Sequence, residues 1–253
     1  MQAWLQPCNL VTNQPNRPDR LLHEPWLQPS HHVTKGAVVQ TIVVASQKGG
    51  AGKTTLTSHL AVEAERQGVS PVAVIDTDPQ AGLSGWFRVR TSDTPALVKV
   101  LPEGLAATLA KLAEGGVPLC IIDTPPAITE SIASTVALAD LVLIPARPSP
   151  NDLRAVGATV DIVEEAGKPM VFVVNQAISR TKIKTETIKA LSQHGPLAPV
   201  EIHHRVDFAA SMTDGRTAGE LDIKSASAAE ITDLWTYLAD RLARRKRYGL
   251  TAR

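Results

Sequence analysis

Residues Lys48 to Thr55 read Lys-Gly-Gly-Ala-Gly-Lys-Thr-Thr, and the rest of the sequence is best understood outward from this stretch. The apolar, β-branched run Thr41–Ala45 precedes it, and a stretch with helical periodicity over 53–67 follows it. A strand, a glycine-rich turn and a helix in this order predict a phosphate-binding loop. Glycines make such a loop possible, because backbone N–H groups can then turn inward around an anion without clashes from side chains.

The residue types in the loop predict how it would hold a nucleoside triphosphate. Lys53 can reach the β- and γ-phosphates, and the hydroxyl of Thr54 can bind Mg²⁺. A second lysine, Lys48, is not needed for such a cradle and is therefore the most informative residue of the stretch. The glycines that we predict to form the cradle are Gly49, Gly50 and Gly52.

Two further apolar runs end in carboxylates. Val72–Ile75 is followed by Asp76 and Asp78, and Leu119–Ile122 is followed by Asp123. Parallel strands deliver such side chains to the same edge of the sheet as the loop. There one acid can orient Mg²⁺ or its waters, and another can hold the attacking water. The first pair of acids has an alternative interpretation as a helix cap and a turn, but the loop upstream favours the chemical role.

From Gln40 onward, short apolar runs alternate with helix-like stretches, which is typical of βαβ units. The runs are too continuous for strands with one face in water. We therefore expect an α/β fold, a mostly parallel twisted sheet with helices on both faces. The predicted strands are Thr41–Ala45, Val72–Ile75, Leu119–Ile122, Leu141–Ile144, Met170–Val174 and Val200–Ile202. The predicted helices cover 53–67, 105–114, 129–138, 152–166, 181–193 and 227–247.

Two local patterns add detail. Between Trp86 and Leu101 the alternation weakens, and we expect a mobile connection there. Ser227 and Glu230 have the spacing of a capping box at the start of the last helix. The apolar positions that follow recur with helical spacing, at Ile231, Leu234, Trp235, Leu238 and Leu242.

Composition places one globular domain in the chain. It has 253 residues, of which 43% are hydrophobic and 20% charged, and its net charge of +1 predicts no particular partner. We divide it into a disordered Pro-rich leader (1–38), a P-loop ATPase domain (39–247) and a basic flexible tail (248–253). The leader could instead be an over-long translation start or a docking peptide. Because the sequence has neither a membrane-length apolar run nor a signal peptide, we expect a cytoplasmic protein.

The motifs together resemble those of the ParA/MinD family of P-loop ATPases, in which the loop is called a deviant Walker A motif. The resemblance extends over nearly all of the chain after residue 39. It is strongest to the small ParA-type partition ATPases that lack an N-terminal helix-turn-helix domain. The stretches that carry it are Lys48–Thr55, Asp76–Gln80, Ile122–Pro126, Leu143–Leu153, Arg205–Gly215 and Lys224–Glu230.

The resemblance implies ATP and Mg²⁺ as cofactors and an ATP-dependent homodimer that sandwiches two nucleotides. Lys48 would reach across to the phosphates of the partner, where an additional cation offsets the repulsion between facing phosphate groups. By position in the motifs, Thr55 would contact the α-phosphate, Asp78 would position the catalytic water, and Asp123 would hold the Mg²⁺ shell. Asp76 would support the same site, and Asn175 would read the edge of the adenine.

The resemblance also implies that the ATP-bound dimer binds duplex DNA without sequence preference and associates with the nucleoid. A small adaptor bound to a centromere would stimulate hydrolysis, which we expect to be slow without it. Binding of this kind needs cations aimed at phosphates. The predicted DNA contacts are Arg205 and Arg216 first, followed by Lys182, Lys184, Lys224, Arg244 and Arg245. Each of these has the alternative interpretation of a solvated surface charge.

Two related functions stay open on the sequence alone: a positioning ATPase for a protein cargo or microcompartment, and a membrane-recruited regulator like MinD. The second is disfavoured, because the basic end of the chain lacks a stripe of large apolar residues. Iron–sulfur relatives are disfavoured because Cys8 and Cys120 do not supply cluster ligands. Targeting factors for tail-anchored proteins commonly carry a C-x-x-C, which this sequence lacks. Tyrosine kinases of the group need a Tyr-rich tail, and the sequence has only Tyr237 and Tyr248.

Overall fold

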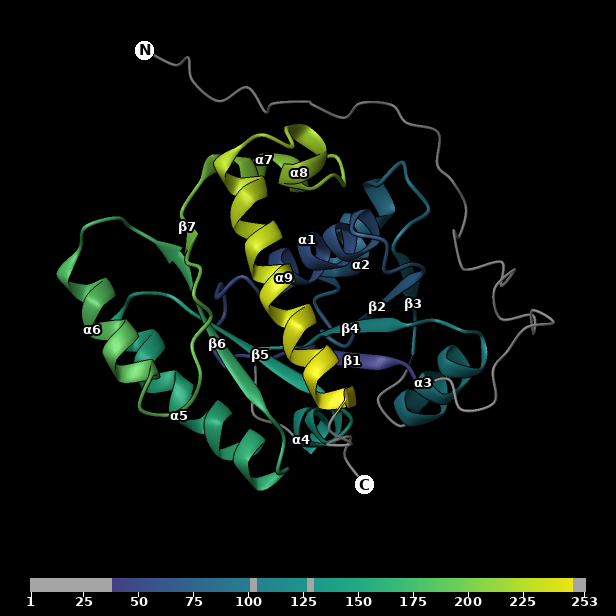
Figure 1. Cartoon of the computed structure of the whole chain (residues 1–253), viewed down its shortest axis with the longest axis horizontal. Helices are drawn as coiled ribbons and strands as arrows, with labels where there is room; N and C mark the ends of the chain where they lie inside the picture. The colour runs from purple at the N-terminus through teal and green to yellow at the C-terminus, as the bar shows by residue number, and fades with distance from the viewer. Residues whose placement is uncertain (1–37, 101–103, 127–129, 248–253) are drawn as a thin grey trace, which may run out of the picture.

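Seven strands form one parallel sheet in the order β3-β2-β4-β1-β5-β6-β7 in the computed structural model, which describes residues 38–100, 104–126 and 130–247 (Figure 1). This confirms the α/β fold that the alternation predicts. The strands are β1 Gln40–Val44, β2 Val72–Asp76, β3 Ala96–Val98, β4 Leu119–Asp123, β5 Leu141–Ala146, β6 Met170–Ala177 and β7 Ile202–His203. The helices are α1 Lys53–Arg66, α2 Gly82–Val89, α3 Leu105–Glu114, α4 Glu130–Ala137, α5 Pro150–Glu165, α6 Lys182–Leu191, α7 Val206–Met212, α8 Ala218–Leu221 and α9 Ala226–Arg247.

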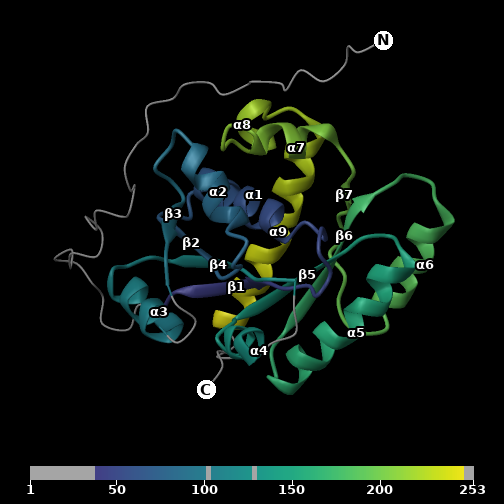
Figure 2. The same cartoon turned by 180° about the vertical axis from the view of Figure 1, so that it is seen from behind.

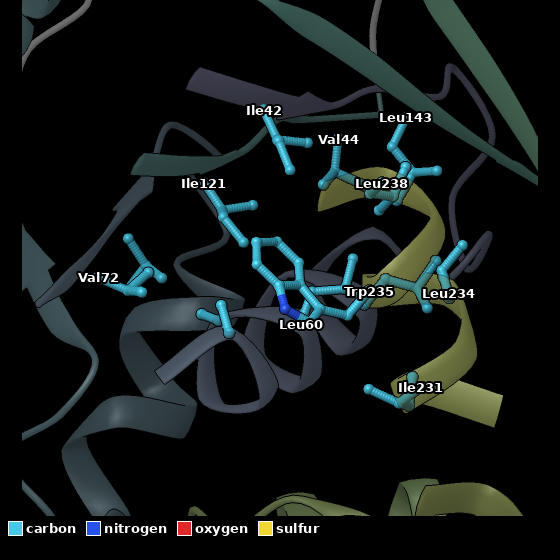
Figure 3. Packing of buried hydrophobic residues seen from close by; sticks show 14 of the residues in the cluster. Ile42, Val44, Leu60, Val72, Ile121, Leu143, Ile231, Leu234, Trp235 and Leu238 are labelled. Atoms are coloured by element: carbon cyan, nitrogen blue, oxygen red, sulfur yellow. The ribbon is translucent and has the colours of Figure 1, made fainter. Parts of the chain in front are cut away.

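Alternate strand residues point to opposite faces of the sheet and build two apolar layers. Ile42 and Val44 of β1 face α1 and α9, where Trp235 and Leu238 of α9 pack against them (Figure 3). Val43, between them, belongs to the opposite layer, which α3, α4, α5 and α6 cover (Figure 2). Each such side chain, fully buried, contributes about 1.5–3 kcal/mol. The two-sided cover explains why the strands read as continuous apolar runs.

The expectation of a mobile connection between Trp86 and Leu101 is wrong for the described part of that segment. Helix α2 extends to Val89, and β3 pairs with β2 at the edge of the sheet. The helix buries Leu83, Trp86 and Phe87, which have helical spacing. It has only eight residues and the strand only three, so neither is long enough to produce a periodic signal in the sequence.

The predicted capping box at Ser227 and Glu230 is also wrong. Helix α9 begins at Ala226, and the hydroxyl of Ser225 accepts the first-turn hydrogen bond, from Ala228 N at 3.1 Å. The hydroxyl of Ser227 donates to Asp207 instead, and the carboxylate of Glu230 binds residues of β7 and the turn after it. A capping box does occur, between Thr217 and Glu220 at the start of α8.

Helices α7 and α8 were not predicted. They have seven and four residues, less than two helical turns, so neither produces a periodic apolar pattern in the sequence. The predicted leader (1–38), apart from Val38, and the predicted tail (248–253) lie outside the described residues. Within the described residues, none of the helices combines the length and the apolar character that a membrane span requires.

The topology places the glycine-rich loop at the centre of the sheet edge where the strands end. Strand β1 lies between β4 and β5, and Val44 at its end pairs in register with both Asp123 and Leu143. The loop that follows β1 is therefore flanked by the residues that follow β4 on one side and β5 on the other. Open α/β sheets bind their ligands at such an edge.

Candidate functional site

The loop between β1 and α1 has the backbone of an anion cradle. Gly50 and Gly52 have φ angles of +75° and +91°, in the left-handed region where a side chain is strained. A β-carbon at Gly52 would also overlap Nδ2 of Asn175, so any other residue there would have to displace that amide. Gly49 differs, because a β-carbon built on it would have no neighbour within 4 Å. The backbone conformation of the loop therefore explains two of the three predicted cradle glycines, Gly50 and Gly52.

Thr54 and Asp123 are joined directly. The hydroxyl of Thr54, in the first turn of α1, donates to Oδ2 of Asp123 at the end of β4, at 2.6 Å. Asp123 is fully buried, and its second oxygen, Oδ1, has no hydrogen-bond partner among the described residues. Burial, assisted by the nearby charge of Asp76, raises the pKa of Asp123 to about 7, although the hydrogen bond from Thr54 acts in the opposite direction.

A buried carboxylate oxygen without a partner calls for a compensating group. A hydroxyl beside a carboxylate is a donor set that suits Mg²⁺, which prefers oxygen ligands and keeps several of its waters. No group of three or more His, Cys, Asp or Glu side chains in the described residues forms a ready-made metal cluster. Thr54 and Asp123 thus fit a cation that shares its remaining ligands with water and phosphate.

Lys53 lies within the same cluster. It is only 7% exposed, and burial lowers the pKa of its ammonium group, while the charges of Asp123 and Asp78 oppose that shift. An anion in the cradle would supply the negative charge that a buried ammonium group lacks. The first residue of α1 is therefore placed where the sequence predicted a phosphate-binding lysine.

The two acids at the end of β2 and in the turn after it, Asp76 and Asp78, differ in what they contact. Oδ2 of Asp76 accepts hydrogen bonds from the backbone and the hydroxyl of Ser84, both at 2.8 Å, which caps the start of α2. Asp78 accepts one bond through Oδ1, from Gln80 N at 2.9 Å, and is half-buried beside the loop. Its Oδ2 has no partner among the described residues. Asp76 thus has a structural role as a cap, while Asp78 keeps an oxygen available at the site.

Two amide side chains from the end of β6 hold the loop from the other side. Asn175 donates through Nδ2 to the carbonyl of Ala51 at 2.7 Å, and Gln176 donates through Nε2 to the carbonyl of Gly50 at 3.0 Å. Gln176 adopts a φ of +52° at a register shift between β6 and β7, which turns its side chain toward the loop. Gln176 is not among the site residues predicted from the sequence, and the signal that points to it is its position directly after Asn175.

A cavity of about 440 Å³ opens beside the loop, between α1, β7 and α7. Asn175 and Thr55 lie on its wall, so the predicted adenine contact stands at the cavity even though its amide also binds the loop. Apolar and polar groups mix around it, as is typical of sites for a heterocyclic ligand. The residues lining it include Leu56, Ile202, Phe208, Met212, His204 and Arg205.

Lys48 lies at the outer start of the loop. Its carbonyl accepts from Ala51 N at 3.4 Å, and its side chain is half-buried. In the part of the chain that the structure describes, its ammonium group has no ion-pair partner. A cation that the fold itself does not neutralise remains available for a ligand or for a second molecule.

The predicted DNA contacts are spread over several elements, and most already pair with acids of this chain. The turn before α7 carries Arg205, that before α8 carries Arg216, and exposed Lys224 precedes α9. The side chain of Arg245, in α9, lies outside the described residues. The ion pairs are Arg205–Glu230 at 2.7 Å, Arg216–Asp214 at 2.6 Å, Lys184–Glu201 at 2.8 Å, Arg244–Asp240 at 2.8 Å and Lys182–Glu186 at 3.6 Å.

Comparison with known proteins agrees with this geometry. A family model described as the CobQ/CobB/MinD/ParA nucleotide binding domain matches residues 42–218. Maintenance of carboxysome distribution protein A of Halothiobacillus neapolitanus is 29% identical over 201 residues, which cover 75% of this chain and 91% of that protein. Protein ParA of Rhizobium radiobacter is 28% identical over 158 residues, 60% of this chain and 67% of that protein.

Solved structures share the fold. The septum site-determining protein MinD of Pyrococcus horikoshii, complexed with Mg-ADP, superposes with a TM-score of 0.68 at 20% identity. The superposition covers 81% of this chain and 98% of that one. At this identity the likeness concerns the arrangement of the strands and helices.

Proposed function

The chain belongs to the CobQ/CobB/MinD/ParA nucleotide-binding family, and on this premise we propose that it hydrolyses ATP with Mg²⁺ and dimerises in its ATP-bound form. The observation that carries the proposal is the pairing of Thr54 with the buried Asp123, next to Lys53. A loop that only bound phosphate would not need a buried acid with an unpartnered oxygen beside it.

The proposed roles follow from where each side chain lies. Lys53 would bind the β- and γ-phosphates, and Thr55 the α-phosphate. Thr54 and Asp123 would hold Mg²⁺, which when bound offsets the negative charge that develops on the phosphates. Asp78, with its free oxygen, would position the attacking water. Asp76 would act indirectly, because its bonds to Ser84 fix the turn that carries the other acid.

We propose that Lys48 completes the site of a second copy of the chain. Its ammonium group is not neutralised within the described residues, and it stands at the exposed start of the loop. Two such loops that face each other bring two triphosphates together, and one lysine from each side offsets their repulsion. The dimer would then form only when ATP is bound.

For the cargo, we propose non-specific duplex DNA, with a small centromere-bound adaptor that stimulates hydrolysis and release. The resemblance of the motifs to partition ATPases and the likeness to protein ParA support this. Among the predicted contacts that pair with an acid, Lys182 is the least constrained, since its side chain is 91% exposed and its ion pair with Glu186 is 3.6 Å long. Arg205 and Arg216 would have to exchange a carboxylate for a DNA phosphate.

A second candidate function is the positioning of a protein cargo. Its support is the likeness to maintenance of carboxysome distribution protein A, which this chain matches over 91% of that protein's length. The ATPase site and the dimer would be the same in both functions, and only the adaptor would differ. Pull-down with the product of the neighbouring gene separates them: a small DNA-binding adaptor supports partition, and a cargo protein supports positioning.

The proposed function is tested by ATP hydrolysis and by ATP-dependent binding to a random-sequence duplex, measured by fluorescence anisotropy at several salt concentrations. We expect hydrolysis to require Mg²⁺, and the affinity for DNA to fall steeply as salt rises. Lys48→Ala should abolish dimerisation and DNA binding. Lys111→Ala, at an exposed position of α3, is the matched control. Dimerisation and DNA binding that survive Lys48→Ala would refute the sandwich arrangement.

A further inference from the structure

Arg147 is brought to the phosphate loop by the strand order. It follows β5 directly, and β5 pairs with β1, so that Ala45 N donates to the carbonyl of Leu143 at 3.0 Å at the start of the loop. A β-carbon built at Gly50 would lie 3.5 Å from Nη1 of Arg147, and no other group lies within 4 Å of it. The guanidinium therefore stands against the rim of the loop, on the side away from Asp123.

The orientation of this guanidinium is fixed by Asp152. Nε of Arg147 donates to Oδ1 at 2.9 Å, and Nη2 donates to Oδ2 at 3.2 Å. Asp152 is 2% exposed, and although burial would raise its pKa, hydrogen bonds from Arg147 and Ser149 hold that pKa below its usual value. The fork thus uses two of its three nitrogens on the acid. Nη1, the third, has no hydrogen-bond partner among the described residues and faces Gly50.

Asp152 does not cancel the positive charge that the loop experiences. It lies in the first turn of α5, where Ser149 caps the helix and accepts a hydrogen bond from Asp152 N at 3.1 Å. The positive end of the helix dipole takes up part of the negative charge of the carboxylate. The outer edge of the guanidinium, which points away from the acid, keeps donors and positive potential directed at the loop.

We propose that Arg147 is a phosphate-binding residue of this site: its Nη1 donates to the triphosphate held in the loop, and Asp152 is the positioning residue that aims it. The inference rests on the proposed function, because it assumes a nucleoside triphosphate as ligand. The two strands that flank β1 then have complementary tasks. Strand β4 supplies the acid for Mg²⁺, and β5 supplies a guanidinium whose planar donors suit phosphate oxygens.

The test is equilibrium binding of ATP and of inorganic triphosphate to the full-length chain, by calorimetry, for the wild type and five variants. Arg147→Gln should weaken both ligands about tenfold, on the order of one charge-assisted hydrogen bond. Arg147→Lys should recover only part of the loss, since lysine cannot keep the bidentate contact. Asp152→Asn should weaken binding severalfold in the wild type but have no further effect in an Arg147→Gln background.

Arg154→Gln is the matched control, because Arg154 is an exposed arginine of the same helix and its loss changes the net charge equally. Thermal unfolding of each variant without ligand reports whether it folds. Equal affinity of Arg147→Gln and wild type for both ligands would overturn the inference while leaving the proposed ATPase intact. A wild type that binds ATP without hydrolysing it would refute the proposed function, yet the affinity comparison would still decide the role of Arg147.

Discussion

The hydroxyl of Thr54 donates a 2.6 Å hydrogen bond to Asp123, an acid that lies 69 residues later in the chain. The bond ties the first turn of α1 to the end of β4, and the second carboxylate oxygen of Asp123 stays buried without a partner in the described part of the chain. This single contact joins the binding loop to the acid that we propose for Mg²⁺.

We expect Asp123 to reduce the free energy of unfolding as pH rises. Burial raises its pKa from 3.8 to about 7, so the folded state resists losing the proton more than the unfolded state does. The penalty is absent below pH 4, grows between pH 4 and 7, and is complete above pH 7. Urea unfolding of the ligand-free protein across this range should show a slope that Asp123→Asn removes. If the free energies of unfolding of the wild type and of Asp123→Asn differ by the same amount at every pH from 4 to 7, the raised pKa of Asp123 is contradicted.

We expect His59 to have the opposite effect to Asp123, so that the free energy of unfolding decreases as pH falls. It is buried in α1, where its Nδ1 bonds the carbonyl of Thr55 at 2.7 Å and its Nε2 accepts from Ala218 N at 3.1 Å. Burial lowers its pKa to about 4, so the folded state keeps it neutral and stability is lost as pH falls from 6.5 to 4. His59→Gln should reduce the loss of stability between pH 6.5 and 4, and it should lower the free energy of unfolding at pH 7 by about 1–3 kcal/mol. The exposed His194→Gln should change neither quantity.

Gly52→Ala should disrupt the loop, and Gly49→Ala should not. At Gly52 the φ is +91° and a β-carbon would overlap Nδ2 of Asn175, whereas at Gly49 the space is open. We expect Gly52→Ala to displace the amide of Asn175, to lower the free energy of unfolding by roughly 1–3 kcal/mol, and to weaken ATP binding more than tenfold. Chemical denaturation and calorimetry measure the two effects. Equal behaviour of the two variants would show that the close contact with Asn175 has no role.

Glu220→Ala should destabilise the protein through Arg90. That guanidinium, 3% exposed, makes bonds of 2.9 and 2.8 Å to the carboxylate of Glu220 and lies over the ring of Trp86. Removing the acid would break two charge-assisted hydrogen bonds to a buried guanidinium, at a cost of roughly 2–4 kcal/mol. The cost stays below that of a fully buried pair because Glu220 itself is 30% exposed. Thermal unfolding measures the loss. Glu165→Ala, at an exposed position of α5, serves as the control and should be neutral.

Local sequence patterns predicted the features that depend on residues close together in the chain. The glycines and Lys53 of the loop, the apolar runs and the acids that end them each leave a signal within a few residues, and the structure places them at one edge of the sheet. Helix α2 and strand β3 escaped because they are short. Arg147 escaped for another reason: its position beside Gly50 depends on β5 pairing with β1, and no pattern within the run Leu141–Ile144 specifies its neighbour.

The predicted capping box at Ser227 and Glu230 shows that a local pattern can also predict a contact that the fold does not form. Ser227 and Glu230 have the correct spacing, but Glu230 instead accepts hydrogen bonds from His203 N and from Arg205. The tertiary contacts of Glu230 with His203 and Arg205 therefore replace the capping interaction that the spacing predicts. The spacing of Ser227 and Glu230 therefore could not assign the partners that these two residues have in the fold.

The sheet ends on both sides in very short strands, three residues in β3 and two in β7. An outer strand with many unpaired N–H and C=O groups is a template on which another chain can add a strand, and brevity removes that template. Copies of this protein therefore have little opportunity to join by extending one sheet into the next. Reversible self-association would therefore have to use side chains and loops. A bound nucleotide can order and release such contacts, whereas it cannot separate edge strands joined by backbone hydrogen bonds.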